Sequence, residues 1–255
     1  MNVYTMLDHN RDMLVEAIFQ SICEQDGGRW QPSNKLQEEK YREDINYHLA
    51  YLADAIMAND PTLYGDYMVW VQELFAGLNF APDALTMTHA SIASVLQEQC
   101  DPAAWQALQP FLNEAANRLS ADQTKQPSHI EETMPLGSVA KELLTLLLAG
   151  NRREALRLVL DQTKSGFSVQ DIYLFVFQPV LYEIGRLWQV NKASVGDEHF
   201  VTASIQFIMS HLYEEIFVTP RNGRKLVATS VSGELHEVGV RMLTDIFELN
   251  GWNTI

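Results

Sequence analysis

The spacing of apolar residues changes near residue 218, and this change limits the folds open to the chain. Before that point apolar residues recur every three or four positions, which predicts amphipathic helices. After it, residues 225–230 form a short β-prone run, residues 238–249 return to the helical spacing, and residues 252–255 begin a second β-prone run. A strand, a helix and a strand in this order open a parallel α/β sheet. We therefore expect a mainly α chain that ends with the start of a doubly wound, Rossmann-like α/β domain.

The first part of the chain, residues 1–119, is expected to fold as a helical domain. Its first helix covers residues 4–25, and a second follows the break at residues 32–34. Asp60-Pro61 starts a third helix, because Asp accepts hydrogen bonds from free amides and Pro suits the first turn. Two further helices begin near Pro82-Asp83 and Asp101-Pro102.

Aromatic residues gather on the second and third of these helices. The second carries His48 among Tyr47 and Tyr51, with Tyr64 nearby. Core packing explains such a cluster, and the alternative is a site for a second planar chromophore.

His89 and His129 are expected at the surface. The expected inner face of the third helix consists of Leu63, Tyr67, Trp70, Leu74 and Phe75.

A linker and a second group of helices follow. Residues 120–134 are polar, aperiodic and interrupted by proline, which is typical of a connection between domains. Residues 135–218 then hold helical segments whose connections are short enough to make neighbours antiparallel. This pattern predicts a four-helix bundle with segments near 136–149, 151–163, 168–188 and 194–217. Residues 225–255 would form the first βα unit of the sheet domain. One such unit cannot bury both its faces, so we expect the natural chain to continue.

Composition excludes several classes of protein. The formal net charge of −15, from 33 acidic and 18 basic residues, would repel phosphate backbones, so direct binding of nucleic acid is not expected. Cys23 and Cys100 are far apart, and neither a disulfide framework nor a zinc site is implied. No apolar run approaches the roughly 18 to 20 residues needed to cross a bilayer. We expect a soluble, cytoplasmic protein without contact to a membrane.

His236 lies in the turn after the first β-prone run, where open α/β sheets bind ligands. A neutral imidazole can ligate a transition metal, and the carboxylate of Glu234 could hold its other nitrogen. Gly239 would let the backbone approach a bulky ligand. Taken alone, a single loop histidine is more often a surface residue.

The pattern formed by Glu234, His236 and Gly239, followed by a helix that ends in Asn250-Gly251-Trp252, resembles the cobalamin-binding domain family. In that family the matched histidine replaces the cofactor's own dimethylbenzimidazole. The resemblance implies that His236 is the lower axial ligand of cobalt. Glu234 stands where an Asp is commoner.

A second group of residues lies in the expected bundle, where Trp188 is followed after nine residues by Glu198-His199. Trp188 closes one helix and the pair opens the next. An indole can stack on a flat ring, a carboxylate can accept hydrogen bonds from hydroxyls, and an imidazole can reach a metal. The alternative is a core aromatic beside a carboxylate favoured by the helix dipole.

This spacing resembles the signature of the adenosylcobalamin-dependent photoreceptors. The resemblance implies that Trp188 and Glu198 surround the upper adenosyl group, and that His199 can take the upper axial position after light breaks the carbon–cobalt bond. It implies a cobalamin-dependent sensor rather than an enzyme. The alternatives left open are a corrinoid methyl carrier for a methyltransferase system, and a sensor that binds a bilin or haem with cobalamin or in its place.

The sequence does not identify the output of such a sensor. Signalling would pass through an unidentified protein effector or a C-terminal part beyond residue 255. A homo-oligomer also stays open, because the same apolar helix faces serve packing within and between chains.

Overall fold

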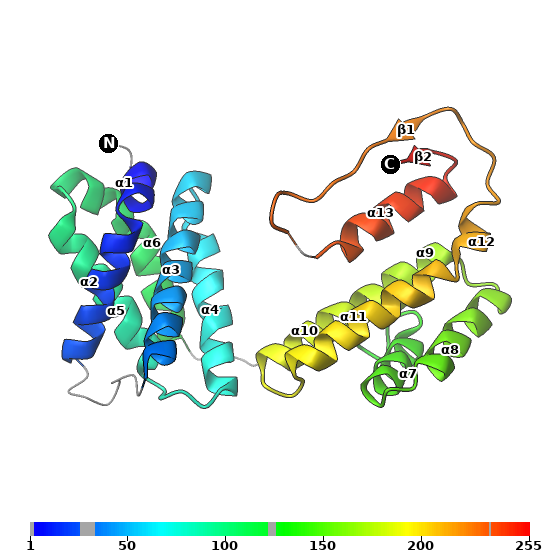
Figure 1. Ribbon diagram of the computed structural model, residues 1–255, viewed down its shortest axis with the longest axis horizontal. Helices are drawn as coiled ribbons and strands as arrows, with labels where there is room; N and C mark the ends of the chain where they lie inside the picture. The colour runs from blue at the N-terminus through cyan, green and yellow to red at the C-terminus, as the bar shows by residue number, and fades with distance from the viewer. Residues whose placement is uncertain (1–2, 26–33, 122–125, 235) are drawn as a thin grey trace. The chain divides into compact units, whose positions relative to one another are not determined.

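The computed structural model describes residues 3–25, 34–121, 126–234 and 236–255. The chain divides into two compact units, Met1–Lys125 and Gln126–Ile255, and each has its own apolar core. Helices make up most of both units, which confirms the mainly helical fold predicted from the apolar spacing (Figure 1). None of the helices in the described ranges combines the length and the apolar character that a membrane span requires.

Met1–Lys125 is a helical unit whose helix starts follow the capping signals of the sequence. Asp60 accepts a hydrogen bond from the amide of Thr62 at 2.9 Å, and Asp101 accepts from the amides of Ala103 and Ala104. The helices described in this unit are α1 (Val3–His9), α2 (Arg11–Gln25), α3 (Lys35–Ala58), α4 (Pro61–Gly77), α5 (Ala84–Gln99) and α6 (Pro102–Ser120).

The single helix expected over residues 4–25 is two helices, α1 and α2, separated at Asn10. The side-chain amide of Asn10 donates to the carbonyl oxygen of Met6 at 3.0 Å. Asparagine side chains compete in this way for the backbone groups of a helix, which is why they favour helix ends.

The buried face of α4 differs from the one predicted. Tyr64, Gly65 and Met68 face the core, whereas Leu63 and Trp70 are exposed. A Cβ atom on Gly65 would lie 2.8 Å from the side chain of Arg118 on α6. The missing side chain therefore lets α6 approach this face of α4 closely, and that approach decides which side of α4 is buried.

Gln126–Ile255 begins with a helical bundle whose third segment is not a continuous α-helix. Residues Tyr173–Phe177 form a π-helical turn, η1, between two α-helical parts. Pro179 lies two residues after this turn, and because it has no N–H it interrupts the regular ladder of hydrogen bonds at this point. The elements of the bundle are α7 (Gly137–Leu148), α8 (Arg152–Lys164), α9 (Val169–Ile172), η1, α10 (Gln178–Gln189), α11 (Val195–Ser210) and the short α12 (Tyr213–Ile216).

A βα unit follows the bundle, as predicted, but its strands are short. β1 (Lys225–Leu226) pairs in parallel with β2 (Asn253–Thr254), and α13 (Val238–Leu249) connects them. The strand expected over residues 225–230 ends at Leu226, and the last backbone hydrogen bond between the two segments runs from the amide of Ala228 to the carbonyl of Ile255.

The inner face of α13 contains acidic residues that apolar spacing did not reveal. Val238 and Met242 are buried as expected, but Asp245 and Glu248 are buried beside them. Both carboxylates have partners. Asp245 accepts a hydrogen bond from Tyr173, and Glu248 accepts from the amide and hydroxyl of Thr254 and pairs with Arg221.

Candidate functional site

The loop before α13 presents His236 to solvent. Nδ1 of its ring lies 2.6 Å from Oε1 of Glu234, and the same oxygen accepts the backbone amide of His236 at 2.7 Å. An ionised carboxylate only accepts hydrogen bonds, so Nδ1 carries a hydrogen, and in the neutral ring Nε2 then keeps its lone pair. The side chain of His236 is 90% exposed. The structure therefore brings Glu234 and His236 together in an arrangement suited to metal ligation through Nε2.

A groove of about 510 Å³ lies next to this loop. It follows the carboxyl ends of β1 and β2, the edge at which open α/β sheets bind ligands. Its lining includes Glu234 and the hydroxyl-bearing residues Thr229, Ser230, Thr244 and Thr254. Gly239 lies in the first turn of α13, where a Cβ atom would have no neighbour within 4 Å. Its expected role in a close approach to a ligand stays a prediction.

The residues expected at the upper face lie on either side of the connection between α10 and α11. Trp188 is in the last turn of α10 and is partly exposed. Glu198 and His199 are in the first turns of α11, whose start is fixed by a capping box between Ser194 and Asp197. The fold thus brings both parts of the motif to one end of the bundle.

Glu198 and His199 also contact each other directly. Nδ1 of His199 lies 2.5 Å from Oε2 of Glu198, and the other carboxylate oxygen accepts the hydroxyl of Thr202 at 2.9 Å. The His199 side chain is 75% exposed and that of Glu198 is 26% exposed. This pair repeats the arrangement of Glu234 and His236, with a carboxylate that orients an exposed imidazole.

Sequence reasoning did not single out Glu183, which lies on the same helix as Trp188. Glu183 is buried, pairs with Arg186 at 2.6 Å and accepts the backbone amide of His129 at 2.8 Å. Burial opposes its ionisation, but the hydrogen bonds from Arg186 and His129 outweigh burial and hold its pKa below the usual value. An arginine three residues later on the same helix was the available signal.

The two carboxylate–histidine pairs lie in different elements of the unit. Figure 1 shows the loop before α13 and the connection between α10 and α11 toward the same end of the unit. A ligand between them would have to span the space from the bundle to the loop.

The described residues do not gather three or more His, Cys, Asp or Glu side chains around a point that could hold a bare metal ion. A metal carried by its own macrocycle needs only axial ligands from the protein, and single exposed imidazoles meet that need.

The fold and these side chains define a class: a helical bundle with an aromatic and an acid–histidine pair at one end, followed by a βα unit with an exposed histidine loop. Residues 139–213 match the family model described as B12 binding domain. The match covers α7 through α11 and includes Trp188, Glu198 and His199, whereas His236 lies outside it. The chain therefore contains a B12-binding domain. Searches of curated proteins and of solved structures gave no match.

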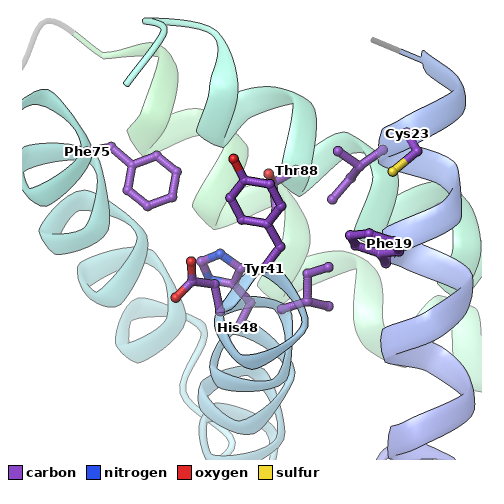
Figure 2. Close-up of a pocket in the computed structure, with 9 residues that line it drawn as sticks. Phe19, Cys23, Tyr41, His48, Phe75 and Thr88 are labelled. Carbon is purple, nitrogen blue, oxygen red and sulfur yellow. The ribbon is translucent and has the colours of Figure 1, made fainter. Parts of the chain in front are cut away.

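The aromatic cluster of Met1–Lys125 packs around a buried histidine. Nδ1 of His48 lies 2.9 Å from the hydroxyl of Tyr67, and the ring of Tyr67 stacks on Tyr51 with centroids 3.9 Å apart. Burial lowers the pKa of His48 to about 4, with a smaller effect from His89. The pocket at His48, drawn in Figure 2, has a volume of only about 10 Å³. That volume holds about one water molecule and no planar chromophore.

A larger groove of about 500 Å³ adjoins this pocket, with Tyr41 and Phe75 in the lining of both. It is open to solvent and is lined by Leu36, Leu74 and Phe80 as well as by polar residues.

The prediction that His89 is a surface residue is wrong. His89 is buried on α5, and its Nε2 lies 3.0 Å from the carbonyl oxygen of Leu112. Desolvation lowers its pKa. A backbone carbonyl on α6 supplies the partner that a buried imidazole needs, and a pattern of side-chain types does not reveal such a partner. His129 is exposed, as predicted.

Proposed function

We propose that this protein is a cobalamin-dependent light sensor, with adenosylcobalamin bound between the end of the bundle and the loop before α13. The observation that carries the proposal is the placement of Trp188 and the Glu198–His199 pair on the two sides of one helix connection, inside the B12-binding domain. A domain that only shields a small methyl group has no need for this combination.

Each upper-face residue offers chemistry suited to an adenosyl group. The partly exposed indole of Trp188 provides a flat surface for an adenine ring. Both oxygens of Glu198 already accept one hydrogen bond, and each has a second lone pair for a ribose hydroxyl. With Nδ1 of His199 facing Glu198, its Nε2 is the nitrogen that can serve as an upper ligand.

His236 would act from the other side. Glu234 fixes its tautomer and orientation, so Nε2 is ready to serve as the lower axial ligand. The groove beside Glu234 offers room for the base that the histidine displaces. Gly239 would allow close approach of the ligand to α13. The side chains that could ligate the cobalt or contact the upper group therefore suit this cofactor.

Bound adenosylcobalamin supplies a cobalt–carbon bond that light can break. Trp188 and Glu198 would contact the upper group only while it is present, so the two states of the cofactor differ in their contacts with α10 and α11. A difference of this kind is what allows a ligand to shift a conformational equilibrium. The output would pass to an unidentified protein effector.

Absorption spectra of the full chain with adenosylcobalamin, in the dark and after green light, test the proposal. We expect a histidine-ligated dark spectrum that changes irreversibly on illumination, and we expect His236→Ala to lose the histidine-ligated form. Trp188→Ala should remove a preference for adenosylcobalamin over methylcobalamin. Equal binding of both forms by the unmodified chain would contradict the sensor proposal.

The second candidate is a corrinoid methyl carrier, because the match to a B12-binding domain is equally expected for a carrier. Equal binding of methylcobalamin, together with methyl transfer to a partner methyltransferase, would favour it. A bilin or haem, with cobalamin or in its place, is the third candidate, and the open groove at Phe75 and Phe80 is where Met1–Lys125 has room for a planar ligand. Mass spectrometry of the cofactor released from purified protein distinguishes these cases.

A further inference from the structure

One polar contact joins α13 to the bundle inside an apolar core. The hydroxyl of Tyr173 donates to Oδ2 of Asp245 at 2.7 Å. Tyr173 is fully buried, and Asp245 is 5% exposed. Burying a carboxylate is costly unless it is hydrogen-bonded. A position of α13 that breaks this hydrogen bond would leave the Asp245 carboxylate buried without the Tyr173 donor, so the position that keeps the bond is favoured.

A second contact anchors α13 one turn earlier. Nε of Arg241 donates to the hydroxyl of Tyr213 at 3.2 Å, and Nη2 donates to the hydroxyl of Ser210 at 3.0 Å. The guanidinium also lies over the ring of Tyr213, 5.4 Å from its centroid. Arg241 and Asp245 are four residues apart and share a face of α13. Two directional contacts on one face fix both the rotation of α13 and its position along the bundle.

The apolar contacts of α13 would not fix its position as closely. Val238 and Met242 pack against the bundle core. Attraction between apolar surfaces is roughly proportional to area and has no direction, so it permits small sliding movements. Tyr173 itself is the first residue of the π-helical turn, and π turns often occur at functional sites.

We propose that Tyr173 and Asp245 are positioning residues for His236. α13 begins two residues after His236, so fixing the helix sets the distance from the imidazole to Trp188 and His199. The geometry of a ligand site must be correct to about half an ångström, which a helix anchor provides and an unsupported loop does not. This role rests on the proposed function, because it presumes that His236 ligates cobalt.

The experiment compares the full chain with Tyr173→Phe, Asp245→Ala and Asp245→Asn. Adenosylcobalamin is the probe, and its absorption spectrum reports histidine ligation. We expect Tyr173→Phe and Asp245→Ala to weaken histidine-ligated binding by about tenfold, the loss typical when support for a metal ligand is removed. Asp245→Asn keeps an oxygen that accepts from Tyr173 and should restore binding. Tyr47→Phe, which removes an exposed hydroxyl in Met1–Lys125, is the matched control.

A second readout needs no cofactor. Hydrogen exchange of the α13 amides in the ligand-free chain should be faster in Tyr173→Phe and Asp245→Ala than in the unmodified protein, while α7 and α11 keep their protection. This result shows that the variants fold and that α13 alone has lost its anchor.

The two proposals fail in different ways. If the unmodified chain does not bind adenosylcobalamin, the proposed function fails and the positioning role fails with it. If the unmodified chain binds through His236 but the variants match it in affinity and spectrum, the positioning role alone is overturned. Failure of Asp245→Asn to restore binding would also overturn it.

Discussion

A single carboxylate oxygen of Glu234 holds both the ring and the backbone amide of His236. We expect Glu234→Ala to lower cobalamin affinity roughly tenfold to a hundredfold, because it frees the ring and its tautomer. A titration followed by absorbance measures the effect. Glu237→Ala removes a neighbouring exposed carboxylate and serves as the control. Equal losses in the two variants would show that general charge, and not orientation of His236, controls affinity.

Gly251 shows how closely the end of α13 packs against the segment before β1. Its φ is +80°, and a Cβ atom would lie 2.5 Å from the carbonyl oxygen of Pro220. Gly150 has a similar φ of +77° but open space around it. Gly150→Ala should cost about 1 kcal/mol of unfolding free energy, since only the backbone conformation is strained. Gly251→Ala should lower the unfolding free energy clearly more, because its Cβ would also clash with Pro220. Equal losses of unfolding free energy in urea would show that the segment before β1 moves aside without cost.

At the scale of the helix, His48 makes the stability of α3 and its neighbours depend on pH. Its pKa is about 4 in the folded protein and 6.5 when exposed, so the unfolded chain binds the proton first as pH falls. The contribution is therefore fully present above pH 6.5 and is lost on the way down to about pH 4. The loss amounts to about 3 kcal/mol of unfolding free energy at most.

Urea unfolding at several pH values measures this effect. His48→Asn keeps a polar atom near Tyr67 but cannot be protonated, so it should flatten the dependence between pH 6.5 and 4. The curve should keep some slope, because the pKa of buried His89 is also lowered and burial raises the pKa of Asp44, beside His48, to about 6, with an effect of opposite sign. His129→Asn, which replaces a histidine at an exposed position, serves as the control. An unchanged slope in His48→Asn would contradict the assignment.

Apolar spacing and capping signals predicted the helices of this chain well, because both act within a few residues. The face that α4 buries could not be predicted from local spacing. It depends on the close approach of α6 at Gly65, and α6 lies far from α4 in the sequence. The π-helical turn before Pro179 and the shortness of β1 were missed for a similar reason: periodicity measures amphipathic character and not hydrogen-bond geometry.

At the scale of the molecule, two separate apolar cores predict two separate unfolding events. Leu49 is fully buried in the first core and Leu143 in the second. Replacing either with Ala should destabilise its own unit by about 2 to 5 kcal/mol. Calorimetry of the full chain should show one transition lowered in each variant. Only Leu143→Ala should weaken cobalamin binding, and loss of binding in Leu49→Ala would show that the units depend on each other.

The candidate site was predictable only where its residues lie close in sequence. Trp188, Glu198 and His199 are separated by one helix connection, and Glu234 and His236 by one residue, so their spacing carries the pattern. The bond between Tyr173 and Asp245 joins residues 72 positions apart, and no local pattern marks it. The hydrogen bond that Glu183 accepts from the backbone amide of His129 could not be predicted for the same reason, because the two residues are 54 positions apart.

The hydrogen bond from the His129 amide to Glu183 links α10 to the start of Gln126–Ile255. The chain enters Gln126–Ile255 through residues that Glu183 ties to the side of α10, the helix that ends at Trp188 and Gln189. Because Glu183 lies on α10, any rotation of α10 about its axis would move the backbone at His129 with it.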